Sequence, residues 1–487
     1  MEICVRYAVF FENRQEYIPR VLENFVRLVH HDHLRVRMRS WYLFYRLVKH
    51  LRAQVQGMTE TVIQSISDLL AIKAEVPGDE ADDDMSSDES DHSADAAFTN
   101  QCYLFEAIGC ISSTNGTPIE KQVLYARTIM EPLFADMEQN LPGAKSGDAQ
   151  AILQVHHIIT ALGILAHGFA DSSSGGNVSK QPPPPKEISE VFSRVAEAIL
   201  VALKELNTNR EIRTACRSAF SRLLGALGAT VLPQLPQWIE GLLSQSSSHD
   251  EMAMFLRLLE QIVFNFKGEI FDILNLLLTP LLQRIFEGLS QPASGTDDEI
   301  QLGELKREYL HFIQIILQHD LGGVLVSETN QGYFESLISS IMTLARTVSH
   351  NNMSTSRLAF GLMIKMTTVW GGPDVATISN NPSPPTGSPT PLIPGFDSFV
   401  IERFHPICWE VLRDPQFNPS DAQTRQVMNE IVQLEQSIYS KTGDAFIRHL
   451  QSSLFPSLGI DGNEFLQCLS TDKKAFLNYL TRLSGSK

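Results

Sequence analysis

The sequence has few cysteines and no long uninterrupted apolar run. Only six of its 487 residues are cysteine, and they lie far apart without a CxxC pair. That pattern argues against structural zinc and for a reducing compartment. No apolar run reaches the length of a membrane-spanning helix, so we expect no membrane insertion. No apolar segment with a small-residue cleavage site follows Met1, so we expect no signal peptide.

The common catalytic and cofactor-binding motifs are also missing. The patterns GxxxxGKS/T, GxGxxG, HExxH and GxSxG do not occur. The histidine pairs at 30–31 and 156–157 are adjacent, so neither pair presents two metal ligands on one helix face. We therefore expect no enzymatic activity, no cofactor and no metal site.

Charge is unevenly distributed along the chain. The net charge is −17, yet nine acidic residues and no basic one lie between Asp79 and Asp95. Between Met1 and Glu60 the balance reverses, with ten Lys or Arg against six Asp or Glu. The overall acidity therefore does not exclude a nucleic-acid partner near the start of the sequence.

Helical periodicity runs through nearly the whole sequence, and no strand-like alternation is sustained. Three segments break the pattern because they are acidic or rich in proline and glycine: residues 76–96, 171–186 and 371–395. Such segments bury too little apolar area to offset the entropy of ordering. We predict an all-α protein with disordered, flexible insertions near these three places.

Proline-containing helix entries recur along the chain. Pro233 and Pro280 are 47 residues apart, and Pro406 and Pro456 are 50 apart. A repeat of about 40–50 residues is in the range of HEAT and armadillo proteins. A single helix pair cannot bury its own apolar face, so neighbouring pairs must stack. We predict that residues 1–487 form one continuous HEAT-type solenoid, an α-α superhelix.

Five sequence motifs follow one another in order. They are residues 1–7 (MEICVRY), 17–22 (YIPRVL), 35–44 (RVRMRSWYLF), 370–372 (WGG) and 474–480 (KAFLNYL). The ordered series resembles the exportin-T family of tRNA-export karyopherins, which belongs to the importin-β group. The resemblance spans the whole chain, with gaps at the predicted insertions.

The resemblance implies a nuclear export receptor. Such a receptor binds mature tRNA on its concave face together with Ran-GTP, contacts nucleoporins and shuttles between nucleus and cytoplasm. The resemblance also implies that this chain corresponds to the C-terminal half of a longer protein. The N-terminal repeats that hold Ran-GTP in this family would then be missing. We expect a monomer.

The best candidate for an RNA-binding surface is the helix predicted near residues 34–52. At 100° per residue its cations share one face, while Val36, Leu43, Phe44, Leu47 and Leu51 share the opposite one. Phosphates require such a surface of multiple cations. A solvated helix face is the alternative interpretation. The candidate tRNA-binding residues are Arg35, Arg39, Arg46 and Lys49, with His30 and His31 just before them.

Aromatic residues in the same helix, Trp41, Tyr42, Phe44 and Tyr45, could stack on bases. Helical phase places half of them on the apolar side, so packing is the favoured role. A second candidate surface consists of Arg210, Arg213 and Arg217, predicted to share one face of a later helix. Glu211 reduces the net charge of that surface, and a structural role is favoured there.

Two functions remain open from the sequence. The first is a tRNA-export receptor that binds RNA electrostatically. The second is an import receptor or scaffold whose acidic solenoid binds basic protein cargo. The net charge suits the second function, whereas the basic helix and the family resemblance suit the first.

Overall fold

The computed structural model describes residues 1–76, 94–170, 184–246, 248–348, 352–375 and 390–485. Within these ranges every regular element is a helix, which confirms the all-α prediction. The chain divides into two compact units, Met1–Ser246 and Ser247–Lys487. That both units belong to one continuous array stays a prediction.

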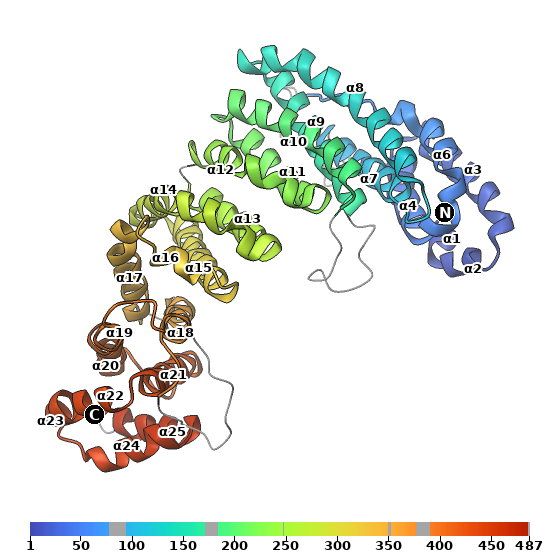
Figure 1. Ribbon diagram of the computed structural model, residues 1–487. Coiled ribbons are helices and arrows are strands. Elements are labelled where there is room, and N and C mark those ends of the chain that lie inside the picture. Colours follow the sequence, from blue (N-terminus) through green and yellow to red (C-terminus); the bar gives the residue numbers. More distant parts are fainter. Residues whose placement is uncertain (77–93, 171–183, 247, 349–351, 376–389, 486–487) are drawn as a thin grey trace. The chain divides into compact units, whose positions relative to one another are not determined.

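The N-terminal unit consists of two layers of helices (Figure 1). In one layer α4, α7, α9 and α11 pack side by side in that order, and in the other α8, α10 and α12 do so. The elements are α1 (Glu2–Arg6), α2 (Ala8–Glu12), η1 (Gln15–Tyr17), α3 (Ile18–Val29), α4 (Leu34–His50), α5 (Arg52–Val55), η2 (Gln56–Met58), α6 (Thr59–Ile66), η3 (Ser67–Leu70), α7 (Ala94–Ser112), α8 (Ile119–Lys145), α9 (Ala149–Ala170), α10 (Lys186–Leu206), α11 (Arg210–Leu227), η7 (Gly228–Gln234) and α12 (Leu235–Leu243).

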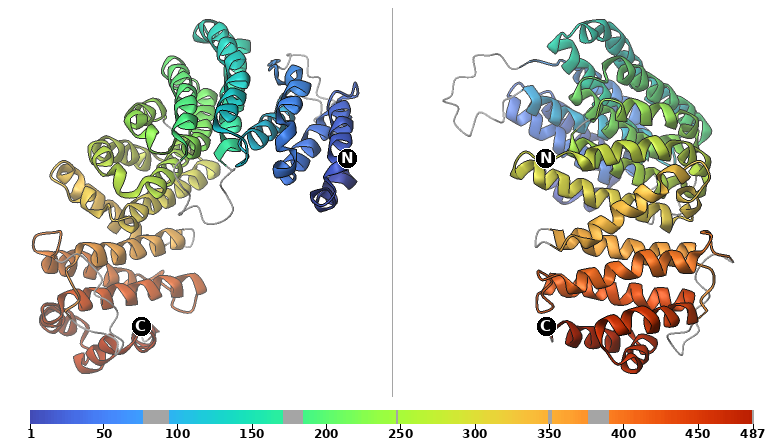
Figure 2. Two further views of the ribbon diagram at one scale, coloured as in Figure 1. Left: turned by 45° about the vertical axis from the view of Figure 1, so that its right-hand side comes forward. Right: turned by 90° about the vertical axis from the view of Figure 1, so that its left-hand side faces the viewer.

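The C-terminal unit repeats the same arrangement, and Figure 2 shows its helices as successive rows. One layer contains α13, α15, α18, α21 and α25 in order, and α14, α17 and α20 form the other. The elements are α13 (His249–Phe266), η8 (Lys267–Ile270), α14 (Phe271–Ser290), α15 (Thr296–Gln318), α16 (Gly322–Leu325), α17 (Gln331–Arg346), α18 (Met353–Trp370), α19 (Phe396–Phe399), η10 (Val400–Phe404), α20 (His405–Arg413), α21 (Ala422–Thr442), α22 (Asp444–His449), η11 (Leu450–Leu454), α23 (Phe455–Leu458), α24 (Gly462–Thr471) and α25 (Lys473–Gly485).

The recurring prolines occupy two kinds of position. Pro406 and Pro456 lie in the first turn of α20 and α23, each directly after a π-helical turn. Proline lacks the N–H that an α-helix would use four residues back, and a wider π turn accommodates that loss. Pro280, in contrast, lies inside α14. The prediction that Pro280 marks a helix entry is therefore wrong.

Small residues bring α7, α9 and α11 unusually close together. A Cβ added at Gly168 of α9 would lie 2.6 Å from the Cα of Gly109 in α7. A Cβ added at Gly163 of α9 would lie 2.7 Å from the Cα of Ala219 in α11. Backbone therefore packs against backbone at both contacts, and the positions of α7 and α11 are fixed relative to α9.

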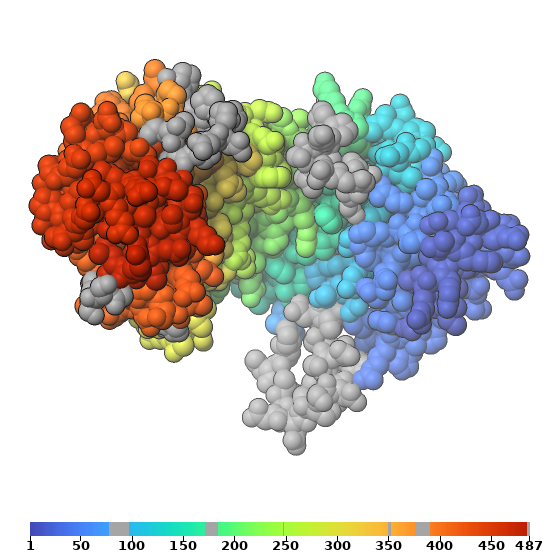
Figure 3. All heavy atoms as spheres, turned by 90° about the horizontal axis from the view of Figure 1, so that it is seen from below, coloured from blue at the N-terminus to red at the C-terminus, as the bar shows by residue number. Residues whose placement is uncertain are grey.

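Helix α9 is the central element of the N-terminal unit. It is long and apolar enough to cross a membrane by length and composition, yet 61% of its most apolar window is buried inside the protein. Its neighbours α7, α8 and α11 cover it. The same composition is expected for the core helix of a water-soluble fold. Figure 3 shows that side chains fill the spaces that the ribbons leave between neighbouring helices.

The three predicted insertions lie mostly outside the described residues. Helix α7 starts at Ala94, two residues before the first insertion was expected to end, and α10 starts at Lys186, the last residue expected in the second. The third insertion is held at both of its described ends. There the Val375 N–H donates to the Ser440 carbonyl at 2.8 Å, and the Leu392 N–H donates to the Trp370 carbonyl at 2.8 Å.

We expect Gly168→Val to destabilise the N-terminal unit by about 1–3 kcal/mol, because the added side chain overpacks the α7–α9 contact. Urea unfolding followed by circular dichroism should show a lower transition midpoint. Gly332→Ala is the control, since a Cβ there meets nothing within 4 Å. It should leave the midpoint unchanged or raise it, because alanine favours helix. Equal effects of the two substitutions would contradict the close packing.

Candidate nucleic-acid interface

Helix α4 presents the basic face that the sequence predicts. Arg35, Arg39, Arg46 and Lys49 are all exposed on it, while Leu43, Phe44 and Leu47 are buried on the opposite side. Val36 differs from the prediction, because it is 36% exposed. In the first turn of α4, therefore, the side that helical phase assigns to the core is only partly buried.

Three tyrosines line the basic face. Tyr42 and Tyr45 of α4 are half-buried, and both lie against Tyr103 of α7, with ring centroids 5.1 Å and 5.7 Å away respectively. Trp41 and Phe44, by contrast, are buried in the core. The aromatic residues of α4 thus divide into a core pair and a surface pair, and α7 adds a third ring to the surface pair.

The cations of α4 lie over these rings. The guanidinium groups of Arg39 and Arg46 lie 5.3 Å and 5.7 Å from the centroid of Tyr42. The Lys49 ammonium lies 5.3 Å from the centroid of Tyr45. Such contacts orient a cation without neutralising it. Beside them Tyr42, Tyr45, Arg46, Lys49 and His50 line a shallow depression of about 440 Å³.

Carboxylates from neighbouring helices contact parts of this face. Glu2 of α1 accepts bonds of 3.2 and 2.8 Å from Nε and Nη2 of Arg39, which lowers the pKa of Glu2. Glu106 of α7 lies 3.9 Å from the Lys49 ammonium. The positive charge of α4 is therefore partly compensated, and a phosphate must compete with these acids for Arg39 and Lys49.

Tyr45 connects Lys49 to Glu106. Its hydroxyl donates to Glu106 Oε1 at 2.6 Å and accepts from the Lys49 ammonium at 2.8 Å. Burial, together with the bond to Glu106, raises the pKa of Tyr45 to about 12. The phenol therefore stays protonated at neutral pH and holds Lys49 at the edge of the depression.

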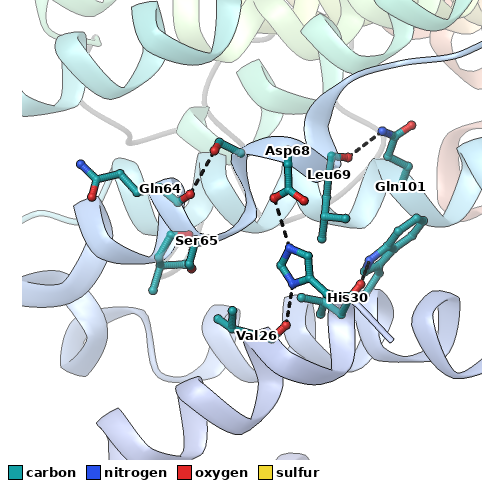
Figure 4. Close-up of polar contacts among 11 residues, drawn as sticks. Val26, His30, Gln64, Ser65, Asp68, Leu69 and Gln101 are labelled. Atoms are coloured by element: carbon teal, nitrogen blue, oxygen red, sulfur yellow. Dashed lines mark hydrogen bonds and ion pairs between the residues drawn. The ribbon is translucent and has the colours of Figure 1, made fainter. Parts of the chain in front are cut away.

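Both ring nitrogens of His30 are hydrogen-bonded to other residues of the chain (Figure 4). Its Nδ1 lies 2.7 Å from the Val26 carbonyl and its Nε2 lies 3.1 Å from Asp68 Oδ1. Both partners accept hydrogen bonds, so the protonated ring with two N–H donors satisfies them best. Burial alone lowers the pKa of His30, but the Val26 carbonyl and Asp68 outweigh it and raise that pKa.

His31 is exposed in the turn before α4. Its Nδ1 accepts a bond of 3.0 Å from the His33 N–H, so this conformation requires a free lone pair on that nitrogen. His31 therefore has one ring nitrogen engaged by the main chain and lies at the margin of the basic face.

The second candidate surface, for which the sequence favours a structural role, does not form. Arg213 and Arg217 are only 5% and 9% exposed, whereas Arg210 is exposed. Arg213 Nη1 donates to the Asn207 carbonyl at 2.6 Å, at the end of α10. The prediction of a shared solvent face is wrong because α9, α10 and α12 all pack on α11. A smaller part of the circumference of α11 is therefore exposed to solvent than in an isolated helix.

Sequence reasoning missed Tyr103 and Glu106, which complete the face from α7. These residues lie about sixty positions after α4 in the sequence, beyond the acidic segment. No local spacing connects the two helices, and only the pairing of α4 with α7 in one layer brings them together. Within the described residues, moreover, no cluster of three or more His, Cys, Asp or Glu side chains could hold a metal ion.

Two layers of paired helices in each unit define the class of α-helical repeat proteins. The family model described as Exportin-T matches residues 1–486. Exportin-T of Pyricularia oryzae is 69% identical over 99% of this chain and 47% of its own length. Exportin-T of Neurospora crassa is 66% identical over 100% of this chain and 48% of its own length. The chain belongs to the Exportin-T family, and it spans about half the length of these curated relatives.

A solved structure of importin-13 in its cytosolic state has the same fold. The TM-score is 0.61 at 13% sequence identity, and the match covers 99% of this chain and 48% of the importin. At this identity the likeness concerns the fold alone. The predicted HEAT-type solenoid fold is confirmed.

The His30–Asp68 contact predicts a pH-dependent stability. The folded-state pKa of His30 is raised, so its contribution is fully present below the unfolded value of about 6.5 and is lost as pH rises through the folded pKa. We expect His30→Gln to cost about 0.5–1 kcal/mol more near pH 5.5 than near pH 8.5, as measured by urea unfolding. Asp68→Asn is the matched variant, and in its background the pH dependence should shrink. A cost of His30→Gln that grows with pH would contradict the assignment.

Proposed function

We propose that this chain forms part of a nuclear export receptor that binds tRNA through the surface of α4 and α7. Membership of the Exportin-T family supports the receptor role. The observation that carries the RNA-binding role is the set of four exposed cations on α4 lying beside Tyr42, Tyr45 and Tyr103.

The proposed contact is electrostatic and sequence-independent. Arg35 and Lys49 are about 21 Å apart along the axis of α4, at 1.5 Å per residue, so the face extends past several phosphates of one strand. Each cation displaces counterions when it contacts a phosphate, which makes binding salt-dependent. The tyrosines add ring faces against which a ribose or an unpaired base can pack.

Not every predicted residue belongs to this surface. Arg35, Arg39, Arg46 and Lys49 form its core, and His31 lies at its margin. We leave out His30, which is engaged by Val26 and Asp68, and Arg213 and Arg217, which are buried. Arg210 is exposed but lies on α11, away from α4 in the order of the layer.

The remaining parts of the proposal follow from the family. We propose that tRNA binds cooperatively with Ran-GTP. Ran-GTP is bound mainly by repeats that the longer relatives have outside the matched half. Nucleoporin contacts, shuttling between nucleus and cytoplasm and a monomeric state complete the proposal. A receptor of this kind binds and releases its cargo without a catalytic step of its own.

We expect reversal of Arg35, Arg39, Arg46 and Lys49 to Glu to weaken tRNA binding strongly. Each lost phosphate contact should lower the slope of log affinity against log salt by about one. The measurement is fluorescence anisotropy with labelled tRNA across a salt series. It should be made on this chain, and on full-length Exportin-T of Pyricularia oryzae with Ran-GTP and the equivalent substitutions.

The matched control reverses four exposed cations of the other unit, Arg413, Arg425, Arg448 and Lys474. It changes the net charge equally, so a general effect of acidity would weaken binding as much as the α4 variant does. Unchanged tRNA binding by the α4 variant would refute the proposed interface. Preference of the wild type for basic peptides over tRNA would instead favour an acidic scaffold that binds basic cargo.

A further inference from the structure

An extended segment crosses the N-terminal unit and is held by glutamine side chains. Residues 71–76, which we call the strap, follow η3 without regular structure. The side chains of the strap alternate, with Ile72 and Ala74 buried and Lys73 and Glu75 exposed. This is the pattern of an extended chain lying on a surface with one side turned inward.

Gln154 of α9 binds the main chain of the strap at two points. Its Oε1 accepts from the Ala74 N–H at 2.8 Å, and its Nε2 donates to the Ile72 carbonyl at 2.9 Å. The same Nε2 donates to Asp136 Oδ2 at 2.6 Å, and Asn140 donates to Asp136 Oδ1 at 2.8 Å. Because both partners of Nε2 are acceptors, the network fixes which way the amide of Gln154 points.

Gln150 repeats the pattern one helical turn earlier on α9. Its Oε1 accepts from the Val76 N–H at 3.2 Å, and its Nε2 donates to the Ala74 carbonyl. Residues four apart lie on one face of a helix, so Gln150 and Gln154 form a short ladder. Each of these two glutamines therefore binds one N–H and one carbonyl of the strap, whose backbone runs along α9.

Gln101 of α7 holds the start of the segment. Its Nε2 donates to the Leu69 carbonyl at 2.7 Å, as Figure 4 shows, and to the Ala71 carbonyl at 3.0 Å. Just before these residues, Asp68 is bound by His30. The hydrogen bonds from the three glutamines to the strap and to Leu69 therefore all go to main-chain atoms.

We propose that Gln101, Gln150 and Gln154 form a binding site for an extended peptide, which the chain fills in cis with the strap. Hydrogen bonds to the main chain give such a site affinity for any extended peptide. The buried side chains, which are two residues apart along the peptide, determine which sequence it prefers. The site fits a branched aliphatic residue followed, two positions later, by a small one, as in Ile72 and Ala74. The exposed Lys73 and Glu75 contribute nothing to that selectivity. An external peptide of this pattern binds when the strap is withdrawn.

The arrangement explains why wild type is closed to such a peptide. A tethered segment acts at a high effective concentration, so it outcompetes a free peptide that makes the same contacts. The strap thus acts as an autoinhibitory contact. The inference is independent of RNA binding, because none of the three glutamines belongs to the basic face of α4.

The test weakens the contacts of the strap by substitution and then adds the sequence of the strap as a separate peptide. Ala74→Pro removes the N–H that Gln154 accepts, and Ile72→Gly removes the buried aliphatic side chain. The probe is a fluorescein-labelled peptide with the sequence of residues 69–76 (LLAIKAEV), followed by anisotropy. We expect saturable binding to the double variant at least about tenfold tighter than to wild type. A peptide with proline in place of the inner alanine should not bind.

Two further measurements test the role of Gln154 directly. Adding Gln154→Ala to the double variant should weaken peptide binding by about tenfold, because two hydrogen bonds are lost. Gln154→Ala in wild type should speed hydrogen exchange at the Ala74 and Val76 amides while the α9 core amides keep their protection. If the α9 amides exchange faster as well, or if a folded double variant binds no peptide, the strap is an inseparable part of the fold and the proposal is wrong.

Discussion

The close contact between α7 and α9 is the constraint on which the N-terminal unit depends. Gly109 and Gly168 let the two backbones approach to a distance that no side chain would allow. Helix α7 then carries Tyr103 and Glu106 to the basic face of α4 and Gln101 to the strap. Helix α9 carries the glutamine ladder. Helix α7 therefore contributes to both the proposed RNA-binding surface and the proposed peptide site, and its contact with α9 fixes its position relative to the glutamine ladder.

Local charge and overall charge have different meanings in this protein. The net charge of −17 describes the whole chain, but a phosphate on α4 is attracted by the nearest cations and screened from distant acids. The important acids are the close ones, Glu2 beside Arg39 and Glu106 beside Lys49. An anion that binds the proposed surface must displace these two carboxylates. A surface of this kind favours a polyanion such as RNA over a single carboxylate.

The sequence predicts the local features of this protein well. The boundaries of α4, the exposure of its four cations and the burial of Leu43 and Leu47 all follow from helical phase. The family also follows, from an ordered series of motifs. The features of α4 depend on residues within a few helical turns of one another, so their spacing in the sequence determines which side of the helix each residue occupies.

Features that depend on packing between repeats could not be predicted in this way. Arg213 and Arg217 have the phase of a solvent face, but neighbouring helices cover it. His30 precedes a basic helix in sequence but is bound by Asp68, which lies 38 residues further along. The strap ends at residue 76, where the predicted insertion begins, and its contacts are seen only where it meets α9.

Crosslinking of tRNA tests the central claim most directly, namely that α4 and α7 form an RNA interface. Zero-length ultraviolet crosslinking joins nucleotides to the aromatic side chains that they touch, and mass spectrometry identifies the crosslinked peptides. The account predicts crosslinks at Tyr42, Tyr45 or Tyr103 that disappear at high salt. Crosslinks confined to other helices, with these tyrosines unmodified, would contradict it.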